Sequence, residues 1–308
     1  MEFAIETFGL GKTYQKIVAV RNLNIQVPHG EIFALLGPNG AGKTTTINML
    51  LGNIRPTMGK ANLLGNPIGD VQTRRRIGFL PEKFQFHDFL NSTEFLRFHG
   101  KLSGLRDATL RSRIPEILEK VGLSENTHTR IREFSRGMQQ RIGLAQAILH
   151  KPELVILDEP TSALDPIGRR DVRDIVHDLK ASGTTVILNS HLLSEIEMTC
   201  DRIAIIYKGE MTVQGTLKEL LSFSSMVQFE VEGMNDAAMR AVRQIVAKLK
   251  IDRVPITHFT VWLHREEAIP DLAHALVTNG VKLKAMVPIR ETLEEMFVRI
   301  IEAQENSE

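Results

Sequence analysis

The segment GPNGAGKTT, residues 37–45, has the residue types and the spacing that bind phosphate. It fits the pattern G-x-x-x-x-G-K-[ST] and directly follows the apolar stretch EIFALL. Glycines let the backbone N–H groups of such a loop turn inward around an anion, and the next helix directs its positive end at the same point. We therefore predict a strand, a phosphate-binding loop and a helix in this order. The residues expected to contact the phosphates are Gly37, Pro38, Asn39, Gly40, Ala41, Gly42, Lys43, Thr44 and Thr45.

Two side chains of this loop have chemistry of their own. We expect Lys43 to reach the β- and γ-phosphates of a nucleoside triphosphate, and the Thr44 hydroxyl to bind Mg²⁺. A glycine turn with only a structural role is a poor alternative, because every position of the pattern matches and the loop stands between a predicted strand and a predicted helix, as phosphate binding requires.

Two adjacent carboxylates end the apolar run LVILDEP, residues 154–160. The run is typical of a strand buried on both faces. Neighbouring carboxylates in an apolar setting are costly unless a metal ion or a proton compensates for them. We expect Asp158 to hold Mg²⁺, directly or through water, and Glu159 to polarise an attacking water. Together with the phosphate loop, this pair indicates a nucleoside triphosphatase.

A second helix start that contains glycine occurs in FSRGMQQR, residues 134–141. Ser135, Gly137 and Met138 place backbone groups at a helix N-terminus, which is again an arrangement that binds anions. One chain can hardly wrap both helix starts around one ATP, because the phosphate loop already occupies the phosphate side. We therefore predict that the second start covers an ATP held by another copy.

Residues 3–220, which carry these motifs in this order, resemble the ATP-binding subunit of an ABC transporter. Residues 135–138 stand at the place of the family's LSGGQ signature, although Arg136 replaces a glycine and Met138 a glutamine. This Ser-x-Gly-Met form is similar to the branch that energises ABC-2 type exporters, as is the tail beyond residue 225. The resemblance implies the ABC cassette of the P-loop NTPases, an α/β fold with a mixed sheet core, an antiparallel β flank and a helical insertion.

The resemblance also assigns residues that the motifs leave open. It implies that Tyr14 stacks on adenine, that Asp165 in SALD belongs to the nucleotide site and communicates across a dimer, and that His191 senses the γ-phosphate. The alternatives are a packing or surface tyrosine and a solvated loop histidine. Glu82 stands where the family most often has glutamine; its carboxylate can bind Mg²⁺, but it adds a negative charge near the γ-phosphate. Gln85 fits the spacing less well.

ATP and Mg²⁺ are the cofactors that the resemblance implies. The implied partners are a second ATP-binding subunit, most simply an identical one, and integral-membrane permease subunits. In the family, the region of KFQFHDFLNSTEF, residues 83–95, grips the permease, and core packing is the alternative for its aromatic residues. We expect the chain to stay in the cytosol, because no apolar run approaches the ~18 residues that span a bilayer and the start lacks the pattern of a signal peptide. The resemblance implies a position on the cytoplasmic face of the membrane.

The charge balance argues against a nucleic-acid partner, because 38 Lys+Arg stand against 37 Asp+Glu in 308 residues. The main rival is a soluble ABC ATPase that acts on DNA or ribosomes, but the chain has no long heptad segment and no second cassette. A GTPase is a weaker rival, because no N-K-x-D motif follows the loop. The single cysteine, Cys200, cannot form an intrachain disulfide and is expected to be buried.

The length predicts about two domains. We expect a cassette of residues 1–221, with a helical subdomain at about 90–150, and a small α+β domain of residues 222–308 after the Ser-rich stretch LLSFSSM. Within the second domain the pattern predicts helices over 236–250 and 266–278, three strands, and a last helix that begins with a capping box of Thr292 and Glu295. This domain shows no chemical motif; it could brace or dimerise the cassette, or regulate it.

Overall fold

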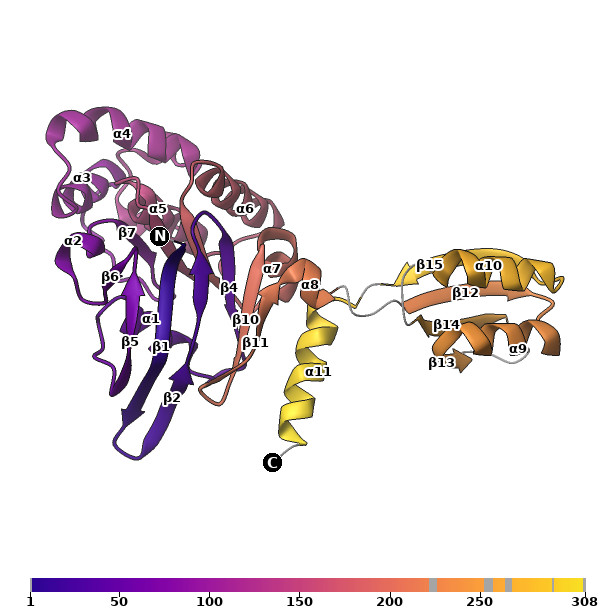
Figure 1. The fold of residues 1–308 in the computed structure, drawn as a ribbon. Helices are drawn as coiled ribbons and strands as arrows, with labels where there is room; N and C mark the ends of the chain where they lie inside the picture. Colours follow the sequence, from indigo (N-terminus) through magenta and orange to yellow (C-terminus); the bar gives the residue numbers. More distant parts are fainter. Residues whose placement is uncertain (1, 222–225, 252–256, 264–267, 290, 307–308) are drawn as a thin grey trace. The chain divides into compact units, whose positions relative to one another are not determined.

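The computed structural model describes residues 2–221, 226–251, 257–263, 268–289 and 291–306 (Figure 1). It divides into two compact units, Met1–Leu217 and Lys218–Glu308. The boundary that the sequence suggests, between residues 221 and 222, stays a prediction, because residues 222–225 lie outside the described residues.

A six-stranded sheet forms the centre of the first unit, in the order β11-β10-β4-β9-β8-β7. Its neighbouring strands are parallel except for the hairpin of β10 and β11. Every residue of β4, β8 and β9 is buried, as expected for apolar, β-branched runs covered on both faces. The carboxyl ends of β4, β9, β8 and β7 therefore lie along one edge, where the predicted site residues follow. The strands are β4 (Ile32–Leu36), β7 (Ile77–Leu80), β8 (Leu154–Asp158), β9 (Thr185–Asn189), β10 (Arg202–Tyr207) and β11 (Glu210–Thr216).

An antiparallel sheet makes up the β flank, with the order β2-β1-β5-β6 and β3 paired to β1. A buried core joins it to the central sheet, since Leu10 and Leu23 of the flank belong to the same apolar cluster as Phe33 and Ile156. The flank consists of β1 (Phe3–Tyr14), β2 (Ile17–Leu23), β3 (Gln26–Pro28), β5 (Met58–Leu63) and β6 (Asn66–Pro67). The expected mixed core with an antiparallel flank is confirmed.

The helices of the first unit include the expected helical insertion, in which α3, α4 and α5 gather on one side of the unit (Figure 1). The apolar positions of α4, such as Leu110 and Ile114, are buried, but Phe98 and Leu102 of α3 are exposed. Helix α5 begins at Arg136, directly after the N-cap Ser135, and α6 begins at Pro166, directly after the N-cap Asp165. The helices are α1 (Lys43–Leu50), α2 (Val71–Arg74), α3 (Ser92–Leu102), α4 (Asp107–Lys120), α5 (Arg136–Ile148), α6 (Pro166–Ala181) and α7 (Leu193–Thr199).

The second unit contains a four-stranded antiparallel sheet in the order β13-β14-β12-β15. With two helices in the sequence β-α-β-β-α-β, this is the ferredoxin-like arrangement. The helix predicted over 236–250 is wrong beyond Ile245, because residues 246–251 pair with β14 and form a strand. The capping box is confirmed, since Thr292 and Glu295 each bond the other's backbone N–H. The elements are α8 (Leu217–Leu221), which begins in the first unit, then β12 (Met226–Glu232), α9 (Asp236–Ile245), β13 (Val246–Ile251), β14 (His258–Leu263), α10 (Ile269–Thr278), β15 (Lys282–Ile289) and α11 (Leu293–Glu305).

Candidate nucleotide site

The loop between β4 and α1 follows a path that glycine alone permits at two points. A Cβ on Gly37 would lie 2.2 Å from the carbonyl oxygen of Ile206, and one on Gly42 would lie 2.5 Å from that of Ala19. Both glycines also have a positive φ, +154° and +104°. Gly42 is the N-cap of α1 and has no side chain to bond the first helical N–H groups, so these donors are available to an anion.

The turn between β10 and β11 supports this loop from the neighbouring strand. The backbone N–H of Gly209 donates to the carbonyl oxygen of Ala41 at 3.0 Å, and the carbonyl oxygen of Gly209 accepts from the N–H of Arg21 at 2.7 Å. Lys208 and Gly209 both have a positive φ, as a tight hairpin turn requires. The turn of Lys208 and Gly209 thus joins the phosphate loop at Ala41 to β2 at Arg21.

Lys43 lies within the phosphate loop. Its Nζ donates to the carbonyl oxygens of Gly37 at 2.7 Å and Pro38 at 3.1 Å. Burial lowers the pKa of the Lys43 ammonium, while the negative charges of Glu159 and Asp158 act in the opposite direction. The cation therefore stands close to both carboxylates.

Asp158 ends β8 with only 3% of its surface exposed. Its Oδ1 accepts a hydrogen bond from Nδ2 of Asn189 at 2.5 Å. Burial raises the pKa of the Asp158 carboxyl, and the charge of Glu82 raises it further, while the Asn189 bond and Lys43 lower it. Glu82 is exposed beyond the end of β7, the strand next to β8, so two carboxylates share this corner of the sheet.

The donor set at this corner fits Mg²⁺. Hard oxygen ligands suit this ion, and Asp158, Glu82 and the hydroxyl of Thr44 are all of that kind. Thr44 is exposed in the first turn of α1, after the loop that ends β4. The raised pKa of Asp158 shows that a nearby dication would relieve the cost of its negative charge. Gln85 is also exposed beyond β7.

Glu159 and His191 form a pair. The backbone N–H of His191 donates to Oε1 of Glu159 at 3.0 Å, and Nδ1 of its ring lies 2.8 Å from Oε2. The Glu159 side chain is 14% exposed and that of His191 is 66% exposed. A carboxylate held in this way can accept a proton from a water molecule, and the histidine ring can turn toward a phosphate on the solvent side.

The backbone of Glu159 is in an unusual conformation, with a φ of +54°. Its N–H donates to the carbonyl oxygen of Asn189 at 2.8 Å. Its carbonyl oxygen accepts from Nε2 of Gln140 at 3.1 Å and from Oγ of Ser162 at 3.2 Å. Left-handed conformations of residues other than glycine persist only where surrounding contacts maintain them. These three bonds therefore fix the direction of the Glu159 side chain.

The signature residues form a second group of contacts. Ser135 is the N-cap of α5, and its Oγ accepts from the N–H of Met138 at 3.2 Å. A Cβ on Gly137 would lie 3.3 Å from Cδ2 of Leu164, so this helix start contacts the segment before α6. Asp165 is the N-cap of α6 and accepts from the N–H of Gly168 at 2.8 Å.

Tyr14 lies at the end of β1, where it pairs with Ile17 of β2. Its ring is 41% exposed, and Nζ of Lys12 lies 5.1 Å from the ring centroid. Val20 of β2 lies close to Gly42, because a Cβ added to Gly42 would be 3.1 Å from Cγ2 of Val20. The hairpin of Tyr14 thus neighbours the phosphate loop, and its tyrosine is exposed.

Two residues at the site escaped the sequence analysis, Gln140 and Asn189. Asn189 is 4% exposed, and within the described ranges its Oδ1 is a buried acceptor without a hydrogen-bond partner. The parallel register pairs Asn189 directly with Asp158, and a comparison of the strand ends LVILD and TVILN could have found it. Gln140 has no comparable signal, because its contact joins a helix to a strand end far along the chain.

Comparison with known proteins identifies the family. The sequence profile described as ABC transporter matches residues 20–162. The ABC transporter ATP-binding protein sll0415 of Synechocystis is 40% identical over 96% of this chain and 84% of its own length. The chain belongs to the ABC transporter ATP-binding proteins. Another such protein, the bacitracin transport ATP-binding protein BcrA of Bacillus licheniformis, is 35% identical over 98% of both chains.

Solved ABC structures agree with the fold of the cassette. An ATP-binding subunit of an ABC transporter superposes with a TM-score of 0.67 at 30% identity and covers 71% of this chain and 92% of its own. The ATP-binding cassette MJ0796, a dimer in a post-hydrolysis state with ADP and phosphate, has a TM-score of 0.65 at 25% identity over 69% of this chain and 98% of its own. The predicted family and the P-loop cassette fold are confirmed, and this ABC protein is an ATP-binding subunit and an ATPase by family.

Proposed function

We propose that two copies of this ABC subunit bind two ATP molecules between them, each ATP contacting the phosphate loop of one copy and the signature residues of the other. The observation that supports this most directly is that Ser135 and Gly137 make contacts of their own, although Gln140 of the same helix bonds the carbonyl oxygen of Glu159. Lys43, Asp158 and Glu159 act on one another electrostatically, whereas Gly137 contacts Leu164 of the segment before α6. The dimeric form of the related cassette MJ0796 is consistent with such an arrangement.

Each residue has a role in this proposal. The N–H groups of the loop and Lys43 bind the phosphates, and Tyr14 stacks on the base. Thr44, Asp158 and Glu82 hold Mg²⁺, which neutralises charge on the phosphates when it is bound.

Hydrolysis needs a water molecule directed at the γ-phosphate. Glu159 orients that water and takes its proton, and His191 keeps the Glu159 carboxylate in place through the bonds described above. Ser135, Gly137 and Met138 of the other copy cover the phosphate side, and Asp165 lies at the contact between the copies. ATP binding closes the pair and hydrolysis opens it.

We propose further that this cycle drives integral-membrane permease subunits in export. BcrA is named for bacitracin transport, which supports a role in transport, and export follows from the resemblance to ABC-2 type exporters. Within the described residues, no helix is both long and apolar enough to cross a bilayer. Phe89, Phe98 and Leu102 are exposed in and next to α3 and provide an apolar surface for that partner. The subunit would then work at the cytoplasmic face of the membrane.

The variant Glu159→Gln tests the proposed site. It keeps the size of the side chain and removes the base, so hydrolysis should fall by roughly 10²- to 10⁴-fold while ATP still binds. Light scattering should then show a dimer that forms with ATP and Mg²⁺ and persists. Glu232→Gln, in an exposed ion pair with Lys284 of the second unit, is the control and should hydrolyse ATP normally. Turnover at the wild-type rate in Glu159→Gln would remove Glu159 from its role.

A separate experiment tests the membrane partner. The tagged subunit is purified from detergent-solubilised membranes of its own cells, and the proteins bound to it are identified. A multi-span membrane protein supports the proposal, and a ribosomal or purely soluble partner contradicts it. Phe89→Ser with Phe98→Ser should weaken the capture of that membrane protein and leave the ATPase rate of the isolated subunit unchanged.

A further inference from the structure

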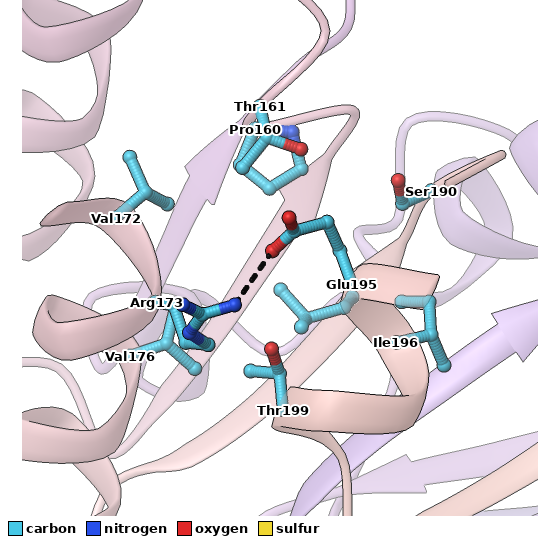
Figure 2. A pocket seen from close by; sticks show the side chains of 10 residues that line it. Pro160, Thr161, Val172, Arg173, Val176, Ser190, Glu195, Ile196 and Thr199 are labelled. Atoms are coloured by element: carbon cyan, nitrogen blue, oxygen red, sulfur yellow. Dashed lines mark hydrogen bonds and ion pairs between the residues drawn. The ribbon is translucent and has the colours of Figure 1, made fainter. Parts of the chain in front are cut away.

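A small cavity lies between α6, α7 and the ends of β8 and β9 (Figure 2). Its walls include Pro160, which follows Glu159, and Ser190, which precedes His191. The volume of about 20 Å³ has room for about one water molecule. The two helices therefore leave a gap beside Glu159 and His191 that apolar packing does not fill.

An ion pair crosses this cavity. Nη1 of Arg173 on α6 donates to Oε2 of Glu195 on α7 at 3.3 Å (Figure 2), and it also lies 3.5 Å from Sδ of Met198. The two side chains are only 22% and 18% exposed, whereas those of the Arg21 and Glu210 pair are 60% and 56% exposed. Ion pairs that are shielded from water are screened less by salt than exposed ones.

Helix α7 depends on such contacts for its position. It has seven residues, and its N-cap, Leu192, gives no side-chain hydrogen bond. Helices of this length are marginal by themselves, and packing must fix them. Ile196 is buried, and the ion pair of Glu195 provides a second attachment. His191 stands two residues before α7, so a displacement of the helix moves its backbone and its bond to Glu159.

We propose that Arg173 and Glu195 are positioning residues, which hold α7, and with it His191, to α6. Helix α6 begins after Asp165, in the segment that contacts Gly137. When a second copy docks against this segment, the ion pair carries the shift of α6 to His191 and aligns it with Glu159. The inference rests on the proposed dimer, and it adds a route by which docking of one copy switches on hydrolysis in the other.

Charge removal and charge exchange test this link. Arg173→Met and Glu195→Gln keep the shape of each side chain and should each lower kcat about three- to tenfold, with the KM for ATP changed less than about twofold. The double variant Arg173→Glu with Glu195→Arg restores an ion pair of the opposite direction and should recover kcat to within about twofold of wild type. The melting temperature of each variant shows that it is folded.

The matched control is Arg76→Met. This change breaks the ion pair between Arg76 and Glu153, which are 2.6 Å apart and whose side chains are 40% and 54% exposed. The pair lies at the amino ends of β7 and β8, away from the site. Its kcat should equal that of wild type.

Three outcomes would overturn the inference: single variants with the wild-type kcat, a rise in KM in place of the fall in kcat, or a folded double variant that stays as slow as the single ones. A failure of the proposed function gives a different result. The wild-type protein would then not hydrolyse ATP, and the Glu159→Gln variant would not form a dimer with ATP.

Discussion

Gln140 controls the backbone of Glu159, and its removal should slow hydrolysis. The φ of +54° at Glu159 costs on the order of 1–3 kcal/mol, and the bond from Nε2 of Gln140 at 3.1 Å helps to maintain it. Gln140→Met keeps the length of the side chain and removes the donor. One such bond is worth about 0.5–1.5 kcal/mol net, and about 1.4 kcal/mol is tenfold in rate. The kcat should therefore fall roughly two- to tenfold.

The assay is the steady-state rate of phosphate release over a range of ATP concentrations, with ATP-dependent dimerisation followed in parallel. Dimerisation should stay intact, because Gln140 does not belong to the phosphate loop or to residues 135–138. Gln140→Lys supplies an N–H donor again and should recover part of the lost rate. Gln139→Met, one position away on α5, serves as the control. If folded Gln140→Met hydrolyses ATP as fast as wild type, the bond does not hold Glu159 in its working position.

Three further changes test other parts of the site. Gly42→Ala forces a Cβ to 2.5 Å from the carbonyl oxygen of Ala19 and should abolish binding of a fluorescent ATP analogue; retained affinity would contradict the loop geometry. Tyr14→Ala should raise the Kd of that analogue by roughly 5- to 150-fold, because about 1–3 kcal/mol of base stacking is lost. Tyr14→Phe keeps the ring and should bind as wild type does. If Tyr14→Ala binds the analogue as tightly as Tyr14→Phe does, Tyr14 does not contact the base. Asp158 has a raised pKa, so the folded chain binds its proton more tightly than the unfolded chain and the free energy of unfolding decreases as the pH rises through that range. Asp158→Asn should therefore increase the melting temperature of the nucleotide-free chain, more at pH 8 than at pH 4, while it stops hydrolysis; a lower melting temperature at pH 8 would contradict the cost assigned to that carboxylate.

Local sequence patterns were enough to predict the parts of the site that depend on consecutive residues. The strand, loop and helix around Gly37 and Lys43 are where the motif places them, and the run that ends at Asp158 is a buried strand. The capping box of Thr292 is likewise a local signal. Each of these features follows from glycine conformations, burial or hydrogen bonds within a few residues.

The remaining features depend on contacts between distant segments. Residues 246–250 continue the predicted helix but belong to β13, because pairing with β14 outweighs a helix propensity that is weak at β-branched Val246. The bond from Gln140 to Glu159 joins residues that are 19 positions apart, and the Arg173 and Glu195 pair joins two helices across a cavity. No periodicity reports such contacts. The roles of Tyr14, Asp165 and Glu82 rest on resemblance, that of Ser135 rests on its helix start, and all four stay predictions.

The turn of Lys208 and Gly209 has a thermodynamic consequence for ligand capture. Because this turn already fixes the backbone at Ala41, the phosphate loop gives up its conformational freedom while the chain folds. An arriving nucleotide then meets donors in their final directions and has little chain entropy to offset. Association should consequently be fast, and the heat released on binding should report contacts with the nucleotide more than the ordering of a loop.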